Sequence, residues 1–417
     1  MQGLLYPAYQ KLYNSLCFLE RLNKESDFYD NIACLDGFFS EYRNITFVMQ
    51  SQLKHTDYYE IYEKNRDIYL TDHWFVEKRN QTTKQHPFQL VKKIKITVYT
   101  PLDEITVTER EFSIDNDIPL KTLLGSIKEY FLEFREVEVF FSVFFSLFEK
   151  NSDIDLVDKI LIGITNMKDF LNSVENEIGA VSEACNQLKE KINKMIFINV
   201  PRDFLLTDDY VYYVASNRFE KAGRWTMLLS LNGEKVANRR LISEMKWSAY
   251  FNIDDTIFGK FTLMHATLRI VKPGVDIMPA IMIIYDDDTY DLDAFHADIK
   301  TTTYRKLNEA AKIVEKQGVK EVLFVTLYAV FPLDQEIPIN SCDRIIRATS
   351  DILVCASIDN QLNEKEYVFD GGKIDNPEYV RYVMKNELKN ELEISRTNMF
   401  PIWQAFSKKE NTYNKKG

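Results

Sequence analysis

Apolar residues recur at helical spacing through the first part of the chain. The pattern runs over residues 4–24, Asp27–Leu53, Tyr58–Arg66 and His73–Gln85. Apolar positions three and four residues apart fall on one face of a helix, so these segments predict four amphipathic helices. Pro87 ends the series, because a proline disfavours helical backbone in the residue before it.

The period of the pattern changes after this proline. Apolar and polar residues alternate from Ile94 to Val98 and again after a polar break, which predicts a β-hairpin over about 88–114. Pro119 can open a helix, and we expect one that continues to about Lys150 and is very rich in phenylalanine.

The next segment has the most regular pattern of the chain. Apolar residues alternate in steps of three and four without interruption, at Val157, Ile160, Ile164, Met167, Leu171, Val174, Ile178, Val181, Cys185, Leu188, Ile192 and Met195. Such heptads predict one helix over residues 157–195, about 58 Å long at ~1.5 Å per residue. It would either form a dimeric coiled coil or fold back on the Phe-rich helix before it.

The C-terminal half differs from the rest of the chain. Phe261–Val271, Ile277–Tyr285, Glu321–Val330 and Asp351–Ile358 are short apolar runs that we interpret as strands, and Thr301–Lys316 has helical spacing. Strand, helix and strand in this order predict an α/β or α+β domain.

These patterns predict an α+β protein of three consecutive parts. Residues 1–150 would form a helical bundle with the hairpin inserted at about 88–114. Residues 151–198 would form the long helix, for packing or dimerisation. Residues 199–417 would form an α/β domain that acts as a sensor or regulator.

Composition limits the classes of protein. The 417 residues are 45% hydrophobic and 28% charged, as in ordinary folded proteins, and no apolar run is long enough to cross a membrane. No secretory signal is evident, and the five cysteines are scattered without metal-site spacing, so we expect a cytoplasmic protein with free thiols. The net charge of −11 disfavours a large nucleic-acid footprint but permits a small site that holds one or two phosphates.

Candidate chemistry is concentrated near the end of the fourth predicted helix. No glycine-rich phosphate loop or other common catalytic motif occurs, and the chain has only five histidines. Arg79 and His86 are seven positions apart, which on a helix places both on one face, about 10 Å apart along the axis. The guanidinium suits a phosphodiester, His86 can exchange a proton, Asn80 can orient a phosphate or ribose, and Lys84 adds a cation.

Arg79-Asn80 followed by His86 resembles the RxxxxxxH signature of HEPN ribonucleases, and the surrounding helices resemble the small bundle of that family. The resemblance implies metal-independent cleavage of RNA without a cofactor, at a composite site formed by two motifs that face each other in a homodimer. Arg79 would stabilise the phosphate, His86 would be the general base or acid, and Asn80 would assist. Many such proteins are toxins or antiphage effectors.

Other residues offer alternatives to this assignment. Arg66 and His73 repeat the spacing, but Asp67 would repel a phosphate and the intervening residues indicate a break between helices. Glu41 and Arg43 are candidates to buttress the Arg79 site, although such residues are usually ordinary surface charges.

The carboxylates and the histidine between Asp286 and Asp298 suit a metal ion, although charge runs are more often simply solvated. Two further functions therefore compete with the ribonuclease. One is a non-enzymatic dimer that binds a ligand or regulatory protein at the C-terminal domain, and the other is a metal-dependent enzyme.

Overall fold

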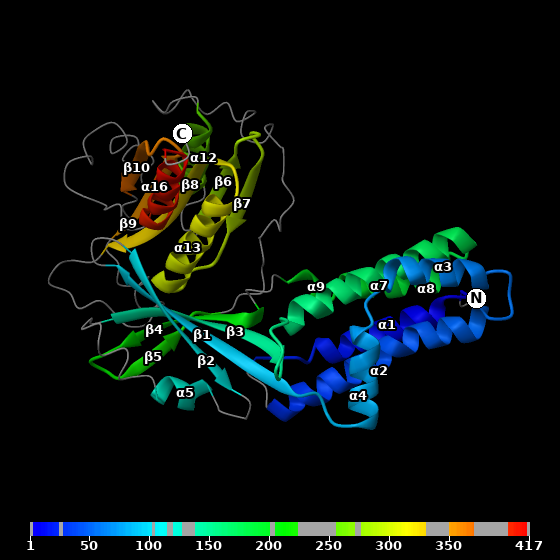
Figure 1. Cartoon of the computed structure of the whole chain (residues 1–417). Helices are drawn as coiled ribbons and strands as arrows, with labels where there is room; N and C mark the ends of the chain where they lie inside the picture. The colour runs from blue at the N-terminus through cyan, green and yellow to red at the C-terminus, as the bar shows by residue number, and fades with distance from the viewer. Residues whose placement is uncertain are drawn as a thin grey trace. The chain divides into compact units, whose positions relative to one another are not determined.

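A computed structural model gives the structure of the chain (Figure 1). It describes residues 3–24, 28–101, 105–114, 120–126, 138–200, 205–223, 256–271, 277–330, 350–370 and 399–414. The chain is mixed α+β, as its patterns predict. It divides into two compact units and not into three consecutive parts: unit 1 holds residues 1–96, 109–133 and 143–208, and unit 2 holds the remainder.

The helices expected in the first part of the chain are confirmed. They are α1 (Tyr6–Leu19), α2 (Phe28–Leu53), α3 (Tyr59–Tyr69) and α4 (Trp74–Lys84). The residues that set their apolar period are those that the packing buries, because α1 lies against α2, and α2 lies against α3 and α4. The amphipathic pattern was therefore sufficient to locate these elements.

The single long helix expected over residues 157–195 is wrong. The structure has α7 (Leu156–Ile178) and α8 (Glu183–Asn193), followed by the short α9 (Ile196–Asn199). Gly179 ends α7 with a left-handed φ of 69°, and its N–H donates to the carbonyl groups of Glu175 and Asn176. Glycine adopts this conformation without the steric cost that a Cβ brings, so it ends the helix here. The heptad pattern of the sequence nevertheless continues through this break between α7 and α8.

The two helices form an antiparallel hairpin within unit 1. Lys189 of α8 pairs with Glu175 of α7, and Lys168 donates to Asn193 at 2.8 Å. Later residues of α8 therefore lie beside earlier residues of α7, as in an antiparallel pair of helices. The apolar seam faces the bundle, where α7 lies against α3 and α8 lies against α1.

The first sheet has the order β2-β1-β3-β4-β5. Its strands are β1 (Leu90–Pro101), β2 (Ile105–Ile114), β3 (Glu138–Glu149), β4 (Thr207–Tyr213) and β5 (Arg218–Lys221). Strands β1 and β2 are neighbours in the sheet and occupy the region of the expected hairpin.

The Phe-rich helix expected up to Lys150 is wrong. Only α5 (Leu120–Ser126) is helical in the described part of that segment, and residues 138–149 form strand β3. Val143, Phe145 and Leu147 are buried, and the residues between them are half-buried. Aromatic and β-branched side chains fit such a partly covered pleated surface, and the segment pairs with β1 and β4.

The second sheet belongs to unit 2 and has the order β10-β9-β8-β6-β7. Its strands are β6 (Ala280–Tyr285), β7 (Tyr290–Ala294), β8 (Val319–Val330), β9 (Ser350–Asp359) and β10 (Glu364–Asp370). Every neighbouring pair is antiparallel. Of the two classes expected here, α/β and α+β, the described strands have the α+β arrangement, because no parallel crossover links them.

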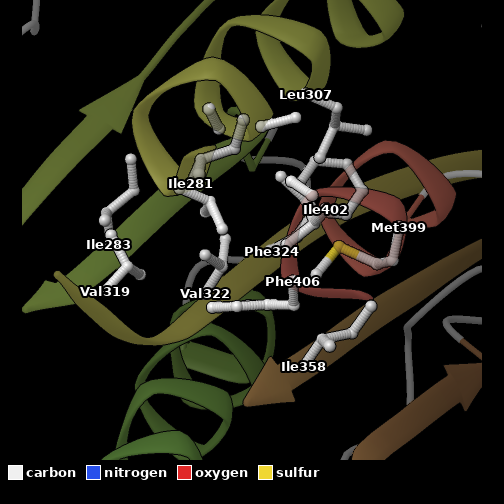
Figure 2. Packing of buried hydrophobic residues seen from close by; sticks show 14 of the residues in the cluster. Ile281, Ile283, Leu307, Val319, Val322, Phe324, Ile358, Met399, Ile402 and Phe406 are labelled. Carbon is white, nitrogen blue, oxygen red and sulfur yellow. The ribbon is translucent and has the colours of Figure 1, made fainter. Parts of the chain in front are cut away.

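Helices cover both faces of this sheet. They are α12 (Ile257–Val271), α13 (Lys300–Lys316) and α16 (Phe400–Asn414). On one face, Leu307 of α13 and Phe406 of α16 pack against strand residues such as Phe324, as Figure 2 shows. On the other face, Phe258 of α12 belongs to a second cluster with alternate residues of the same strands.

The segment Phe261–Val271, expected as a strand, lies in helix α12. A short run that is apolar on all sides does not distinguish a buried helix from a buried strand, which explains the error. Across the described residues, no helix is long and apolar enough to cross a membrane.

Candidate functional site

Arg79 lies in the middle of α4 and is half-buried. Phe75, one turn earlier, is buried in the aromatic cluster of unit 1, and its ring centroid is 4.7 Å from that of Tyr42 in α2. The Nη1 of Arg79 donates to Asn80 Oδ1 at 3.3 Å, whereas its Nε is buried and has no hydrogen-bond partner in the structure. A buried cationic donor without a partner is costly, so this guanidinium has unused capacity to bind an anion.

His86 does not share the helical face of Arg79, contrary to the sequence expectation. Helix α4 ends at Lys84, and Gln85 has φ of −122° and ψ of −63°. Because Pro87 follows directly, His86 cannot easily continue the helix. Its side chain is exposed, and its Nδ1 is 2.9 Å from the carbonyl oxygen of Pro87. The distance of about 10 Å expected along a continuous axis therefore does not apply.

Asn80 and Lys84 are both exposed on α4. Asn80 accepts the hydrogen bond from Arg79, so its amide is available to orient a bound group. Lys84 is the last residue of the helix, where a cation also interacts favourably with the helix dipole.

Asp36 of α2 is a neighbour of His86 that the sequence did not reveal. Its Oδ1 accepts the backbone N–H of Phe88 at 3.1 Å. Burial raises the pKa of Asp36, while the Phe88 N–H and the charge of His86 act to lower it. A carboxylate beside a histidine can orient the ring and stabilise its protonated form. No pattern in the sequence links positions fifty residues apart.

Arg43 of α2 is one of the two residues that the sequence offered either as a buttress of the Arg79 site or as an ordinary surface charge. It lies seven residues beyond Asp36, on the same side of α2. Burial lowers the pKa of Arg43, Tyr62 acts to raise it, and the positive charges of Arg79 and Arg66 lower it further. Glu41, the other candidate buttress, pairs with Lys11 of α1 at 3.0 Å.

The second arginine–histidine match is less suited to bind a phosphate. Arg66 lies in α3 and donates to the Asp67 carboxylate at 2.8 Å. His73 lies at the beginning of α4, so the two residues belong to different helices, as the break in the pattern predicts. The Arg66 charge is compensated, whereas no described carboxylate pairs with Arg79 or Arg43.

The acidic segment 286–298 does not form a metal site in the described part of the chain, where no group of three potential ligands occurs. Its side chains have separate partners. Asp288 pairs with Lys320, Asp291 accepts from Tyr285, Asp293 pairs with Lys306, and His296 lies 3.0 Å from Asp298.

A hollow of about 430 Å³ lies on the first sheet within unit 1. Its lining includes Lys93 and Lys95 of β1 and Phe144 and Phe148 of β3. The Lys93 Nζ is 4.1 Å from the centroid of the Phe148 ring, and the Lys95 Nζ is 5.1 Å from that of Phe144. Aromatic rings beside cations can accommodate a flat or anionic ligand.

No protein-family model, curated protein or solved structure matches this chain.

Proposed function

We propose that the chain is a metal-independent endoribonuclease whose site lies at the end of α4. The observation that carries this proposal is the buried Arg79 Nε without a hydrogen-bond partner, with His86 two residues beyond the same helix and beside Asp36. The Arg79 guanidinium suits binding of a phosphate, and the His86 imidazole suits proton transfer. The resemblance of Arg79-Asn80 and His86 to the HEPN motif supports the same assignment.

In the proposed reaction, the 2′-hydroxyl of RNA attacks the adjacent phosphorus, and the bond from phosphorus to the 5′-oxygen breaks. His86 takes the proton of the 2′-hydroxyl or supplies one to the leaving 5′-oxygen, and Arg79 stabilises the charge on the phosphate. The products are a 2′,3′-cyclic phosphate and a 5′-hydroxyl. Asn80 orients the ribose or phosphate, and Lys84 contacts the flanking backbone.

One histidine cannot be both base and acid in a single step, so the proposal includes a homodimer that supplies a second His86. Unit 1 would hold the active site, and unit 2 would act as the sensor or regulator. An activity of this kind suits a toxin or antiphage effector in the cytoplasm, where its RNA substrates occur.

The test compares the full-length wild type with His86→Ala on total cellular RNA in EDTA. We expect cleavage by the wild type alone, with 2′,3′-cyclic phosphate ends. His55→Ala is the matched control, because His55 is also an exposed histidine of unit 1, and it should cleave normally. Equal cleavage by wild type and His86→Ala would reject the assignment of the site.

The alternative is a non-enzymatic dimer that binds a ligand or protein, and the Lys–Phe hollow on the first sheet favours it. In that case Arg79→Ala and His86→Ala would leave cellular behaviour unchanged, whereas Phe148→Ala would impair it. Loss of activity in EDTA would instead favour a metal-dependent enzyme.

A further inference from the structure

One face of the first sheet carries aromatic side chains among lysines within unit 1. Strands β1 and β3 are neighbours in this sheet, and alternate residues of a strand point to the same face. The residues that share this face are half-buried: Lys93, Lys95, Phe144, Ser146 and Phe148. The residues between them in both strands are buried on the opposite face. Large apolar side chains gathered on an open face often mark a binding surface.

The lysines and phenylalanines of this face form two cation–ring pairs in succession along the strands. The Lys93 Nζ lies 4.1 Å from the centroid of the Phe148 ring, and the Lys95 Nζ lies 5.1 Å from that of Phe144. An unpaired nucleobase stacks well on an aromatic ring, and a lysine beside the ring can contact the phosphate of the same nucleotide. Each pair therefore has the two chemical groups that a nucleotide of a single strand requires.

The ion pairs of these lysines are of the weak, solvent-exposed kind. Lys95 lies 3.2 Å from Glu109, and Lys93 lies 3.8 Å from Asp153. The two carboxylate side chains are 45% and 104% exposed, so solvent screens both pairs and a phosphate can replace them readily. Glu111 also lines the hollow at Lys95, where it is one acidic residue against two lysines.

Two hollows open on this face and share Lys93 and Phe148 among their lining residues. The first has a volume of about 430 Å³, and the second of about 550 Å³. We call the two together the Lys–Phe groove. The second hollow is also lined by Glu149, which pairs with Lys78 of α4 at 2.5 Å. The groove therefore reaches the helix that carries Arg79.

We propose that the Lys–Phe groove binds the single-stranded part of the RNA substrate beside the bond that is cut. Unpaired bases would stack on Phe148 and Phe144, and Lys93 and Lys95 would contact two phosphates. The chain from His86 to Lys93 spans at most about 25 Å even when fully extended, so a short strand can occupy both places. Contact with only two phosphates also agrees with the net charge of −11. This inference rests on the proposed function and adds the form of its substrate.

Binding can be measured separately from cleavage with a fluorescent single strand of 2′-O-methyl RNA, which lacks the nucleophilic hydroxyl. Fluorescence anisotropy on the full-length protein gives the dissociation constant as a function of salt. Phe148→Leu should weaken binding about 5- to 150-fold, as expected for the loss of one stacked base. Lys93→Gln should reduce the steepness of log K against log salt by about 0.7, the contribution of one phosphate contact.

Phe148→Tyr separates stacking from packing, because it retains the aromatic ring that Phe148→Leu removes. It should bind as the wild type does. The matched control is another cation–ring pair of unit 1, in which the Lys191 Nζ of α8 lies 6.0 Å from the centroid of the Tyr13 ring of α1. Tyr13→Leu and Lys191→Gln should bind normally. Circular dichroism checks that each variant is folded.

The outcomes separate the groove from the catalytic proposal. Binding that depends on Phe148 and Lys93 without any cleavage would retain the groove and reject the ribonuclease. Cleavage that depends on His86, with normal binding by Phe148→Leu and Lys93→Gln, would retain the ribonuclease and overturn the groove. Absence of binding by the wild type would also overturn it. If only the binding of ATP, measured in parallel, depends on Phe148 and Lys93, the ligand is a free nucleotide and the RNA assignment is overturned.

Discussion

A buried ion pair anchors α13 within unit 2, and its removal gives the sharpest test of the fold. Asp209 of β4 accepts hydrogen bonds from Arg305 Nε at 3.0 Å and from Ser142 Oγ at 2.6 Å. The Arg305 and Asp209 side chains are only 9% and 6% exposed. Asp209→Ala would remove this carboxylate from the buried guanidinium, while Glu309 would still lie 2.9 Å from Nη1.

We expect Asp209→Ala to destabilise unit 2 by up to about 3–5 kcal/mol, because removing one partner of a buried pair leaves the other charge less well compensated. Glu315→Ala is the matched control on the same helix. Glu315 pairs with Lys408 at 3.0 Å, but the two side chains are 39% and 60% exposed. Solvent screens such a pair, so its removal should cost about 0–1 kcal/mol.

The effect of Asp209→Ala should not vary with pH near neutrality. Burial would lower the pKa of Arg305, but Asp209 and Glu309 raise it well above its ordinary value. A group whose pKa is raised by folding contributes its full stability below its unfolded pKa, and loses it only as the pH rises through the folded pKa. Both values lie far above neutral pH for an arginine.

Hydrogen exchange of α13 amides is the suitable assay, combined with urea denaturation. The two compact units can unfold in separate steps, so a single global transition is not assured, whereas amide exchange reports on the helix itself. Equal acceleration of exchange in Asp209→Ala and Glu315→Ala would refute the anchoring role. The double replacement of Asp209 and Arg305 by leucine should recover part of the loss, because no charge is stranded.

Three further predictions concern backbone conformation, packing and pH. Gly179→Ala should cost about 1 kcal/mol in urea unfolding because its φ is 69°, whereas Gly125→Ala, in helix α5 and also with open space around it, should be neutral or stabilising. Gly163→Ala should cost about 1–3 kcal/mol and perturb the fluorescence of unit 1, because the new Cβ would clash with the Phe75 ring. Burial lowers the pKa of His265 from 6.5 to about 4, so unit 2 should lose stability as the pH falls through that interval. The loss should reach about 3 kcal/mol, at ~1.4 kcal/mol for each pH unit. His265→Gln should show a smaller decrease between pH 7 and 5, and an unchanged decrease would contradict the assignment.

The candidate site was only partly predictable from the sequence. Arg79, Asn80 and Lys84 do lie on α4, because the helical period identified that element. The position of His86 was wrong, although Pro87 carried the signal that the helix ends before it. Asp36 of α2 was not predicted, because no local pattern relates α2 to α4, whereas Arg43 was offered only as one of two possible readings.

The sequence by itself determined which residues are buried and where several helices begin and end. The heptad residues Val157 and Leu188 are buried as expected, even though Gly179 divides their helix. The spacing of apolar residues in an amphipathic helix and the residues that end a helix act over a few positions, so both can be recognised in a single sequence.

For segments that are apolar on more than one side, only the tertiary structure decided whether they form a helix or a strand. Residues 138–149 became a strand, and 257–271 became a helix, according to the surfaces that cover them. It also decided that α7 and α8 turn back on one another, and that Asp36 of α2 accepts the backbone N–H of Phe88, two residues after His86. Such proximities arise from the packing of distant segments, and that packing depends on the sum of many weak contacts that no local spacing records.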